Sequence, residues 1–152
     1  MKKYSVPKNF CSSVGHNSLD NYQSLRENAK QDSNSYWESV AERIDWFDKW
    51  TTVNNTDYSK AHIEWFSNGK LNASYNCIDR HIENGLGEKT ALIWQSNDPT
   101  ISKNVTYNEL LEKVSLFANG LKRAGIQKGD RVCIYMQMIP EAIVAMLACA
   151  RI

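Results

Sequence analysis

Three ionisable side chains stand in a row at Asp79, Arg80 and His81, within the stretch Asn76–His81. A carboxylate, a guanidinium and an imidazole could perform acid–base chemistry if they met at one point. On a helix, adjacent residues project in different directions, so these three side chains cannot converge. We therefore interpret the stretch as structural, with His81 near a helix end, where a positive charge is favourable.

The remaining histidines, His16 and His62, are isolated in the sequence. Neither a Ser–His–Asp order nor the spacing of a metal site is present around them. We therefore predict no catalytic, cofactor-binding or metal-binding residue in this chain.

Two turns of the sequence invite comparison with phosphate-binding loops. Gly69-Lys70 is followed by Leu71 instead of Ser or Thr, and it lacks the upstream glycine of a P-loop. The turn Gln137–Pro140 contains no glycine, although a dinucleotide-binding turn needs glycines so that the backbone can approach the pyrophosphate. Neither turn is predicted to bind phosphate.

The four cysteines are Cys11, Cys77, Cys133 and Cys149, and none forms a Cys-x-x-Cys pair. Cys133 and Cys149 lie in apolar runs and are expected to be small core residues. A disulfide framework or a zinc site is not expected. No apolar segment follows the basic start at Met1, so we predict no signal peptide and a cytoplasmic protein.

The overall composition excludes several classes of partner. The chain has 152 residues, 42% of them hydrophobic, and 18 basic residues against 17 acidic ones. Interspersed charges with a net charge of +1 do not favour nucleic acid or an anionic membrane. The apolar run Val132–Ala150 contains Gln137, Pro140 and Glu141 in its middle, so a membrane span is not expected.

The end of the chain indicates the fold class. A strand is predicted at 131–136, followed by an apolar helix from Pro140. Parallel strands are joined by such crossovers, and in open α/β sheets ligands bind at the carboxyl ends of the strands. A return strand is not present in these 152 residues. We expect the opening segment of a larger α/β protein whose reacting groups lie outside this chain.

The other predicted elements divide the chain into three regions. Residues 1–31 are polar and expected to be poorly ordered apart from a short helix at 19–29. Residues 32–89 are expected to contain a helix at 36–44 with a capping box at Ser35, a polar connector at 51–60 and an extended segment at 63–66. A further helix to Ile82 is expected to be capped by Asn72 or Ser74 and ended by Gly85 and Gly87. Residues 90–152 are expected to begin with a hairpin at 90–106 and a helix that starts from a capping box at Thr106 and ends at Gly125.

Two groups of apolar residues are expected to pack. Four tryptophans in the first half are interpreted as anchors of a small aromatic cluster, in preference to ligand-stacking residues: Trp37, Trp46, Trp50 and Trp65. Five apolar residues near the end are predicted to be core in a longer protein and partly exposed in this chain: Val132, Ile134, Ile143, Val144 and Leu147.

Several stretches resemble the N-terminal part of acetyl-CoA synthetase, an adenylate-forming enzyme. They are Trp65–Asn72, Tyr75–His81, Thr106–Leu110, Lys128–Val132 and Ile139–Ile152. The resemblance covers residues 32–152, and the Leu-Asn, Asn-Cys and Asp-Arg-His pieces are typical of short-chain acyl members. Gln137 departs from the family pattern, which usually has proline there.

The resemblance implies that the parent enzyme forms acetyl-AMP from acetate and ATP, and then transfers the acetyl group to CoA. ATP, magnesium and CoA are implied for the parent, and none is expected to be bound by this segment. The family's phosphate loop, its nucleotide-binding motifs and its catalytic lysine have no counterpart here, so no functional residue is assigned. The missing remainder of the enzyme is the implied structural partner.

Three hypotheses follow for the function. The first is the N-terminal segment of a short-chain acyl-CoA synthetase, inactive alone, with acetate as the leading substrate and propionate as the runner-up. The second is a short non-catalytic binding module, and the third is a relic of a broken gene. The coding sequence beyond codon 152 distinguishes them.

Overall fold

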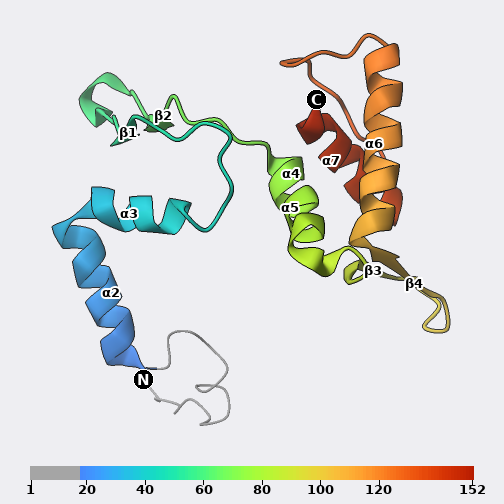
Figure 1. Cartoon of the computed structure of the whole chain (residues 1–152), viewed down its shortest axis with the longest axis horizontal. Coiled ribbons are helices and arrows are strands. Elements are labelled where there is room, and N and C mark those ends of the chain that lie inside the picture. Colours follow the sequence, from blue (N-terminus) through green and yellow to red (C-terminus); the bar gives the residue numbers. More distant parts are fainter. Residues whose placement is uncertain (1–17) are drawn as a thin grey trace. The chain divides into compact units, whose positions relative to one another are not determined.

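The computed structural model describes residues 18–152, and the chain folds as two units. The first unit comprises the described residues up to Ile44 together with Trp50–Ser67. The second comprises Asp45–Lys49 and Asn68–Ile152. Figure 1 labels their helices and strands along the chain. The expected disorder of the first residues lies outside the described part, whereas the predicted helix at 19–29 is present as α2 (Leu19–Gln31).

In the first unit, Asp32 separates α2 from α3 (Ser33–Ala41). One oxygen of its carboxylate accepts a hydrogen bond from the backbone N–H of Ser35 at 3.0 Å, and the other accepts one from the Ser35 hydroxyl at 2.7 Å. The predicted capping box at Ser35 is therefore wrong, because a carboxylate three residues earlier satisfies the free amide. The helix also ends at Ala41 and not at Ile44.

The predicted polar connector at 51–60 is also wrong, because it contains regular structure. Strand β1 (Thr52–Asn54) pairs antiparallel with β2 (Trp65–Ser67), and the 3₁₀ turn η1 (Tyr58–Lys60) lies between them. Edge contacts between rings confirm the aromatic cluster in this unit for Trp37, Trp50 and Trp65. The ring centres are 6.0 Å apart for Trp37 and Trp65, and 5.1 Å apart for Trp50 and Phe66.

The second unit contains two helical turns that the sequence predicted as one helix. α4 (Ala73–Cys77) and α5 (Asp79–His81) are separated at Ile78, whose φ and ψ are −127° and −69°. The Ile78 side chain is fully buried at this break. The π-helical turn η2 (Ile82–Leu86) follows, and its helical geometry breaks at Gly85, with φ of 78°, one of the two glycines expected to end the helix.

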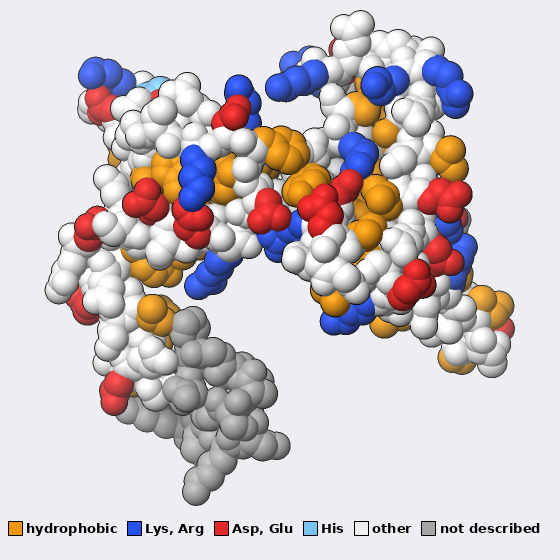
Figure 2. Space-filling model, in the orientation of Figure 1, with side chains coloured by type: hydrophobic (Ala, Val, Ile, Leu, Met, Phe, Trp, Pro, Cys, Tyr) orange, Lys and Arg blue, Asp and Glu red, His pale blue; other side chains and the backbone are white. Residues whose placement is uncertain are grey.

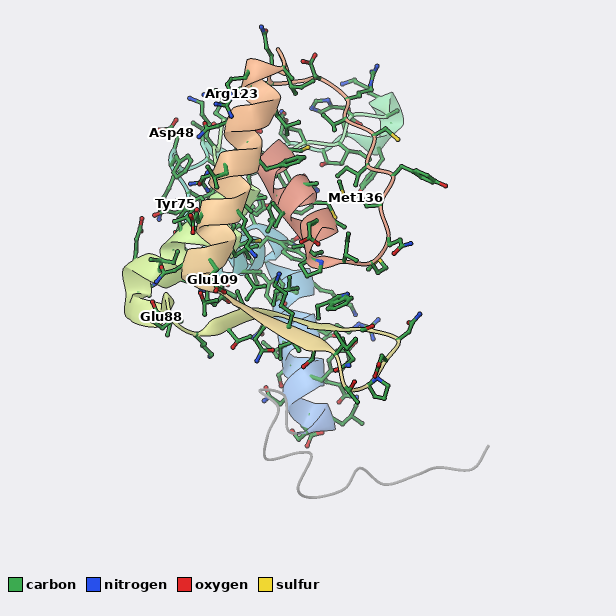
Figure 3. All side chains as sticks on the ribbon, turned by 90° about the vertical axis from the view of Figure 1, so that its right-hand side faces the viewer. Asp48, Tyr75, Glu88, Glu109, Arg123 and Met136 are labelled. Atoms are coloured by element: carbon green, nitrogen blue, oxygen red, sulfur yellow. The ribbon has the colours of Figure 1, made fainter. Side chains whose placement is uncertain are left out.

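The hairpin and the following helix match the prediction. β3 (Thr90–Gln95) pairs antiparallel with β4 (Ser102–Thr106), and α6 (Tyr107–Arg123) starts from the capping box of Thr106 and Glu109. At its other end the N–H of Ile126 donates to the carbonyl of Leu121, with Gly125 at φ of 91°. This is the Schellman ending that only a glycine adopts easily. Figure 3 shows Glu109 at one end of α6 and Arg123 at the other, as the helix dipole favours.

The last helix, α7 (Pro140–Arg151), packs beside α6 (Figure 1). Together with Ile78 and the hairpin, the two helices form the core of the second unit. Its buried members are Ile78, Val105, Leu110, Val114, Ala118, Val144 and Ala148. The mixed α/β class is confirmed. No helix among the described residues is both long and apolar enough to cross a membrane.

The strand predicted at 131–136 is wrong for this structure. Residues 131–137 have no regular secondary structure, and Tyr135 is completely exposed. A strand exists only when a second strand accepts and donates its backbone hydrogen bonds, and no strand of the described chain pairs with this segment. The side chains of Val132, Tyr135 and Met136 are consequently exposed. Figure 2 shows in orange the apolar side chains that lie at the surface on the face in view.

Three burial predictions need correction. Cys133 is exposed and Cys149 is only half-buried, so neither is a core residue here. Val144 is 7% exposed and belongs to the core, because α6 covers its side of α7. Val132, Ile134, Ile143 and Leu147 are partly exposed, as predicted.

Candidate functional site

The strongest polar arrangement of the second unit is built around Asp79. The Arg151 guanidinium donates two hydrogen bonds to the Asp79 carboxylate, at 2.7 and 2.8 Å. The Asp79 side chain is 17% exposed and that of Arg151 is 28% exposed. The hydrogen bond to Asp79 raises the pKa of Arg151 above its ordinary value, so the guanidinium stays charged. The pair joins α5 to the last turn of α7.

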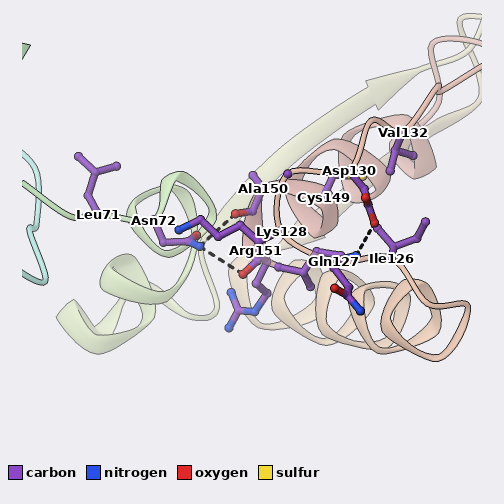
Figure 4. A pocket seen from close by; sticks show the side chains of 12 residues that line it. Leu71, Asn72, Ile126, Gln127, Lys128, Asp130, Val132, Cys149, Ala150 and Arg151 are labelled. Atoms are coloured by element: carbon purple, nitrogen blue, oxygen red, sulfur yellow. Dashed lines mark hydrogen bonds between the residues drawn. The ribbon is translucent and has the colours of Figure 1, made fainter. Parts of the chain in front are cut away.

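Asn72 makes a second connection to the same turn. Its amide nitrogen donates to the carbonyls of Ala150 at 3.0 Å and Arg151 at 3.3 Å. Its amide oxygen accepts the backbone N–H of Tyr75 at 3.1 Å and so caps α4. Figure 4 shows the Asn72 side chain directed at the end of α7.

Asn76 holds a short segment, Asp45–Lys49, which we call the strap. The Asn76 amide oxygen accepts a hydrogen bond from the backbone N–H of Asp45 at 2.8 Å, and its amide nitrogen donates one to the carbonyl of Asp45 at 2.9 Å. The strap also exchanges backbone hydrogen bonds with Lys70, whose ammonium lies 2.8 Å from the Asp48 carboxylate. The hydrogen bond to Asp48 raises the pKa of Lys70, and these contacts give the Gly69-Lys70 turn a structural role.

Tyr75 packs against the strap and carries the largest pKa shift in this region. Its hydroxyl donates to the Glu83 carboxylate at 2.6 Å, and its ring centre is 5.2 Å from that of Phe47. The hydrogen bond to Glu83 raises the pKa of Tyr75 to about 12. The phenol is therefore a poor general base near neutral pH.

A cavity of about 300 Å³ lies beside the end of α7. Its wall includes Asn72, Arg151 and the loop 126–130, in which the Asp130 carboxylate accepts the N–H of Gln127 at 2.7 Å (Figure 4). Asp79 and Asp130 both have hydrogen-bonding partners within the protein. The wall also includes the thiol of Cys149, while the contacts of Asn72, Arg151 and Asp130 support a structural role for these three side chains.

The remaining candidates are dispersed over the two units. His62 lies 3.3 Å from Glu64 in the first unit, and the His81 ring lies 5.0 Å from that of Tyr107 in the second. The Trp94 indole donates to the carbonyl of Met138 at 2.8 Å, which fixes the turn before α7. His16 lies outside the described residues. Among the described residues, no group of three or more His, Cys, Asp or Glu side chains is placed to hold a metal.

Sequence reasoning correctly described Asp79, Arg80 and His81 as divergent, but it missed the partners of Asp79 and Asn72. Those partners lie 72 to 79 residues away in the chain. Local spacing carries no signal for such contacts. The prediction that no catalytic residue lies in this chain stays a prediction.

Comparison with known proteins identifies relatives of this chain. Residues 22–77 match the family described as acetyl-coenzyme A synthetase N-terminus, and residues 79–152 match the family described as AMP-binding enzyme. The acetyl-coenzyme A synthetase of Magnetococcus marinus is 50% identical over 156 aligned positions, covering 100% of this chain. The chain belongs to the acetyl-coenzyme A synthetase family.

Two other family members show the same relationship. The acetyl-coenzyme A synthetase of Sinorhizobium fredii is 51% identical over 88% of this chain, and that of Alkalilimnicola ehrlichii is 45% identical over 99%. The chain spans 21% to 23% of the length of these relatives.

The boundary between the two family matches falls at Ile78, inside the second unit. Asn72 lies in the first match and the carbonyls that it contacts lie in the second. The acetyl-coenzyme A synthetase N-terminus is thus divided between the two units, and its last residues, 68–77, fold with the AMP-binding match.

Proposed function

We propose that this chain forms the N-terminal part of an ATP-dependent ligase that joins acetate to CoA. The observation that carries the proposal is the 50% identity to the Magnetococcus marinus acetyl-coenzyme A synthetase across the whole chain. The contacts of Asn72, Asp79 and Arg151 support it, because residues of both family matches meet in one network.

The chemistry of such a ligase explains its need for ATP. An acetate carboxylate is a poor acyl donor, because its oxygen is a poor leaving group. Transfer of AMP from ATP to that oxygen releases pyrophosphate and gives acetyl-AMP, from which the CoA thiol displaces AMP. Magnesium and cationic groups offset the phosphate charge during the first step.

We assign this chain a scaffolding part in that reaction. Its described polar groups make hydrogen bonds that hold α4, α5 and α7 together, and we place no residue of the chain in catalysis. The chain alone is expected to be inactive. We expect the ligase to act in the cytoplasm, where ATP and CoA are available, on small molecules and not on nucleic acid.

A chimeric enzyme tests the proposal. The aligned N-terminal positions of the Magnetococcus marinus relative are replaced by this chain, and acetate-dependent exchange of pyrophosphate into ATP is measured. We expect the chimera to catalyse the exchange and to form acetyl-CoA, whereas the chain alone does neither. A folded chimera without exchange activity contradicts the proposal, provided that the unmodified relative is active under the same conditions.

A further inference from the structure

The Asn72 side chain lies between the N-terminus of α4 and the last turn of α7, two helix ends with opposite partial charges. Its amide oxygen faces the N-terminus of α4, where it accepts the N–H of Tyr75 at 3.1 Å. Its amide nitrogen faces the C-terminus of α7, where it donates to the carbonyls of Ala150 and Arg151 at 3.0 and 3.3 Å. One side chain thus serves a free N–H group at the start of α4 and two carbonyls in the last turn of α7.

Few side chains can make both connections. The amide of asparagine carries an acceptor and two donors at fixed positions, so one end can cap α4 while the other caps α7. Aspartate supplies only acceptors when ionised, and serine is shorter. Each caps the N-terminus of a helix well, but neither serves the carbonyls of α7 in the same way.

The last turn of α7 is restrained in two different ways. The Asp79–Arg151 pair fixes a side chain of that turn, and Asn72 fixes its backbone. Asn72 is the N-cap of α4 and Asp79 begins α5, and α4 packs against α7. The two restraints are therefore complementary, because they start from neighbouring helical turns and hold different parts of the same helix end.

We propose that Asn72 couples residues 68–77, the last part of the acetyl-coenzyme A synthetase N-terminus match, to the last turn of α7. It does so by capping α4 and by bonding to the carbonyls of α7 at the same time, and we call this side chain the clasp. Lys70, two residues before the clasp, binds the strap, so the strap, the clasp and the end of α7 form one connected element. This coupling concerns folding and position, and it does not depend on the ligase activity proposed above.

The substitution Asn72→Asp separates the two connections. Aspartate retains an oxygen for the Tyr75 N–H, but its ionised carboxylate has no donor and faces the carbonyls of Ala150 and Arg151. In hydrogen–deuterium exchange on the whole chain, we expect the amides of Leu147–Arg151 to exchange about tenfold faster, as for loss of one or two hydrogen bonds. The amides of α4 should keep their protection, because the N-cap is retained.

A pH series provides a signature that a general loss of stability does not share. In the Asn72→Asp variant, protonation of the introduced carboxylate gives a neutral acid that can donate one hydrogen bond. The cations of Lys128 and Arg151 line the same cavity and favour the ionised carboxylate, while Asp79 and Asp130 titrate in both proteins. Relative to the unmodified chain at each pH, protection of Leu147–Arg151 should therefore partly recover only below about pH 4. Asn72→Ser, which is uncharged, should show no such recovery.

Asn84→Asp is the matched control. Asn84 donates its amide to the carbonyl of Arg80 at 2.7 Å, and it is exposed in the same unit. This variant should leave the exchange of Leu147–Arg151 unchanged. The proposal is overturned if Asn72→Asp leaves that exchange unchanged, or if it loosens α4 as much as α7.

Discussion

Arg151 and Asp79 are joined by two hydrogen bonds although they lie far apart in the sequence. Asp79 opens α5, and Arg151 ends α7. A bidentate contact of this kind fixes both the distance and the orientation of its partners. It therefore holds the start of α5 close to the last turn of α7.

Loss of this pair should destabilise the second unit. Asp79→Asn leaves a partly buried guanidinium without its carboxylate, and we expect the free energy of unfolding to fall by about 1–3 kcal/mol. Arg151→Met should have a cost of similar size. Urea unfolding of both single variants and of the double variant measures the coupling. Strictly additive losses would show that the two side chains do not stabilise one another.

Tyr75 should ionise at unusually high pH. The neutral phenol donates to Glu83, so the pKa rises from 10.0 to about 12. This hydrogen bond stabilises the fold fully below the ordinary pKa, and its contribution is lost as the pH rises through about 12. Ultraviolet absorbance of the phenolate should show a late phase that Tyr75→Phe removes. In Glu83→Gln the phase should move to lower pH; an unchanged phase would exclude Glu83 as its cause.

Gly87 has no room for a side chain while Asn108 keeps its position. A Cβ atom built there lies 2.7 Å from the amide of Asn108, although the backbone φ of −55° suits any residue. Gly87→Ala should displace that amide from its exposed hydrogen bond to Glu88, a cost of about 0.5–1 kcal/mol that offsets the gain from reduced backbone entropy. Gly120 of α6 has open space around it, so Gly120→Ala should instead stabilise by about 0.5–1 kcal/mol. Thermal unfolding compares the two variants, and equal effects would contradict the steric explanation.

The boundary between the family matches should be a poor place to divide the protein. A chain shortened to Asp79–Ile152 lacks Asn72, Ile78 and the strap, whereas one that starts at Asp45 retains all three. We expect slow amide exchange in α6 and α7 of the longer chain, and exchange close to that of an unfolded chain in the shorter one. Equal protection in both chains would show that residues 45–78 are dispensable for the core.

Local signals predicted the hairpin and α6 because their determinants are close in sequence. Thr106 and Glu109 form the capping box within one turn, and Gly125 supplies the left-handed residue that ends the helix. The prediction of a strand at 131–136 failed because strand formation depends on a partner strand outside the segment. β1 was missed because its three residues lie in a polar stretch, and its pairing with β2 is what orders them.

The candidate site was less predictable than the fold. The sequence showed that Asp79, Arg80 and His81 diverge, which is a property of one helix. It could not show that Asp79 meets Arg151 or that Asn72 reaches α7, because these contacts depend on how α4 and α5 pack within the second unit.

The most direct test of the proposed ligase is to read the coding sequence beyond codon 152, express the complete product, and measure ATP–pyrophosphate exchange with acetate and with propionate. We predict an open frame whose product exchanges pyrophosphate in the presence of acetate, more efficiently than with propionate. A stop codon directly after Ile152, or a complete folded product without carboxylate-dependent exchange, would contradict the proposal.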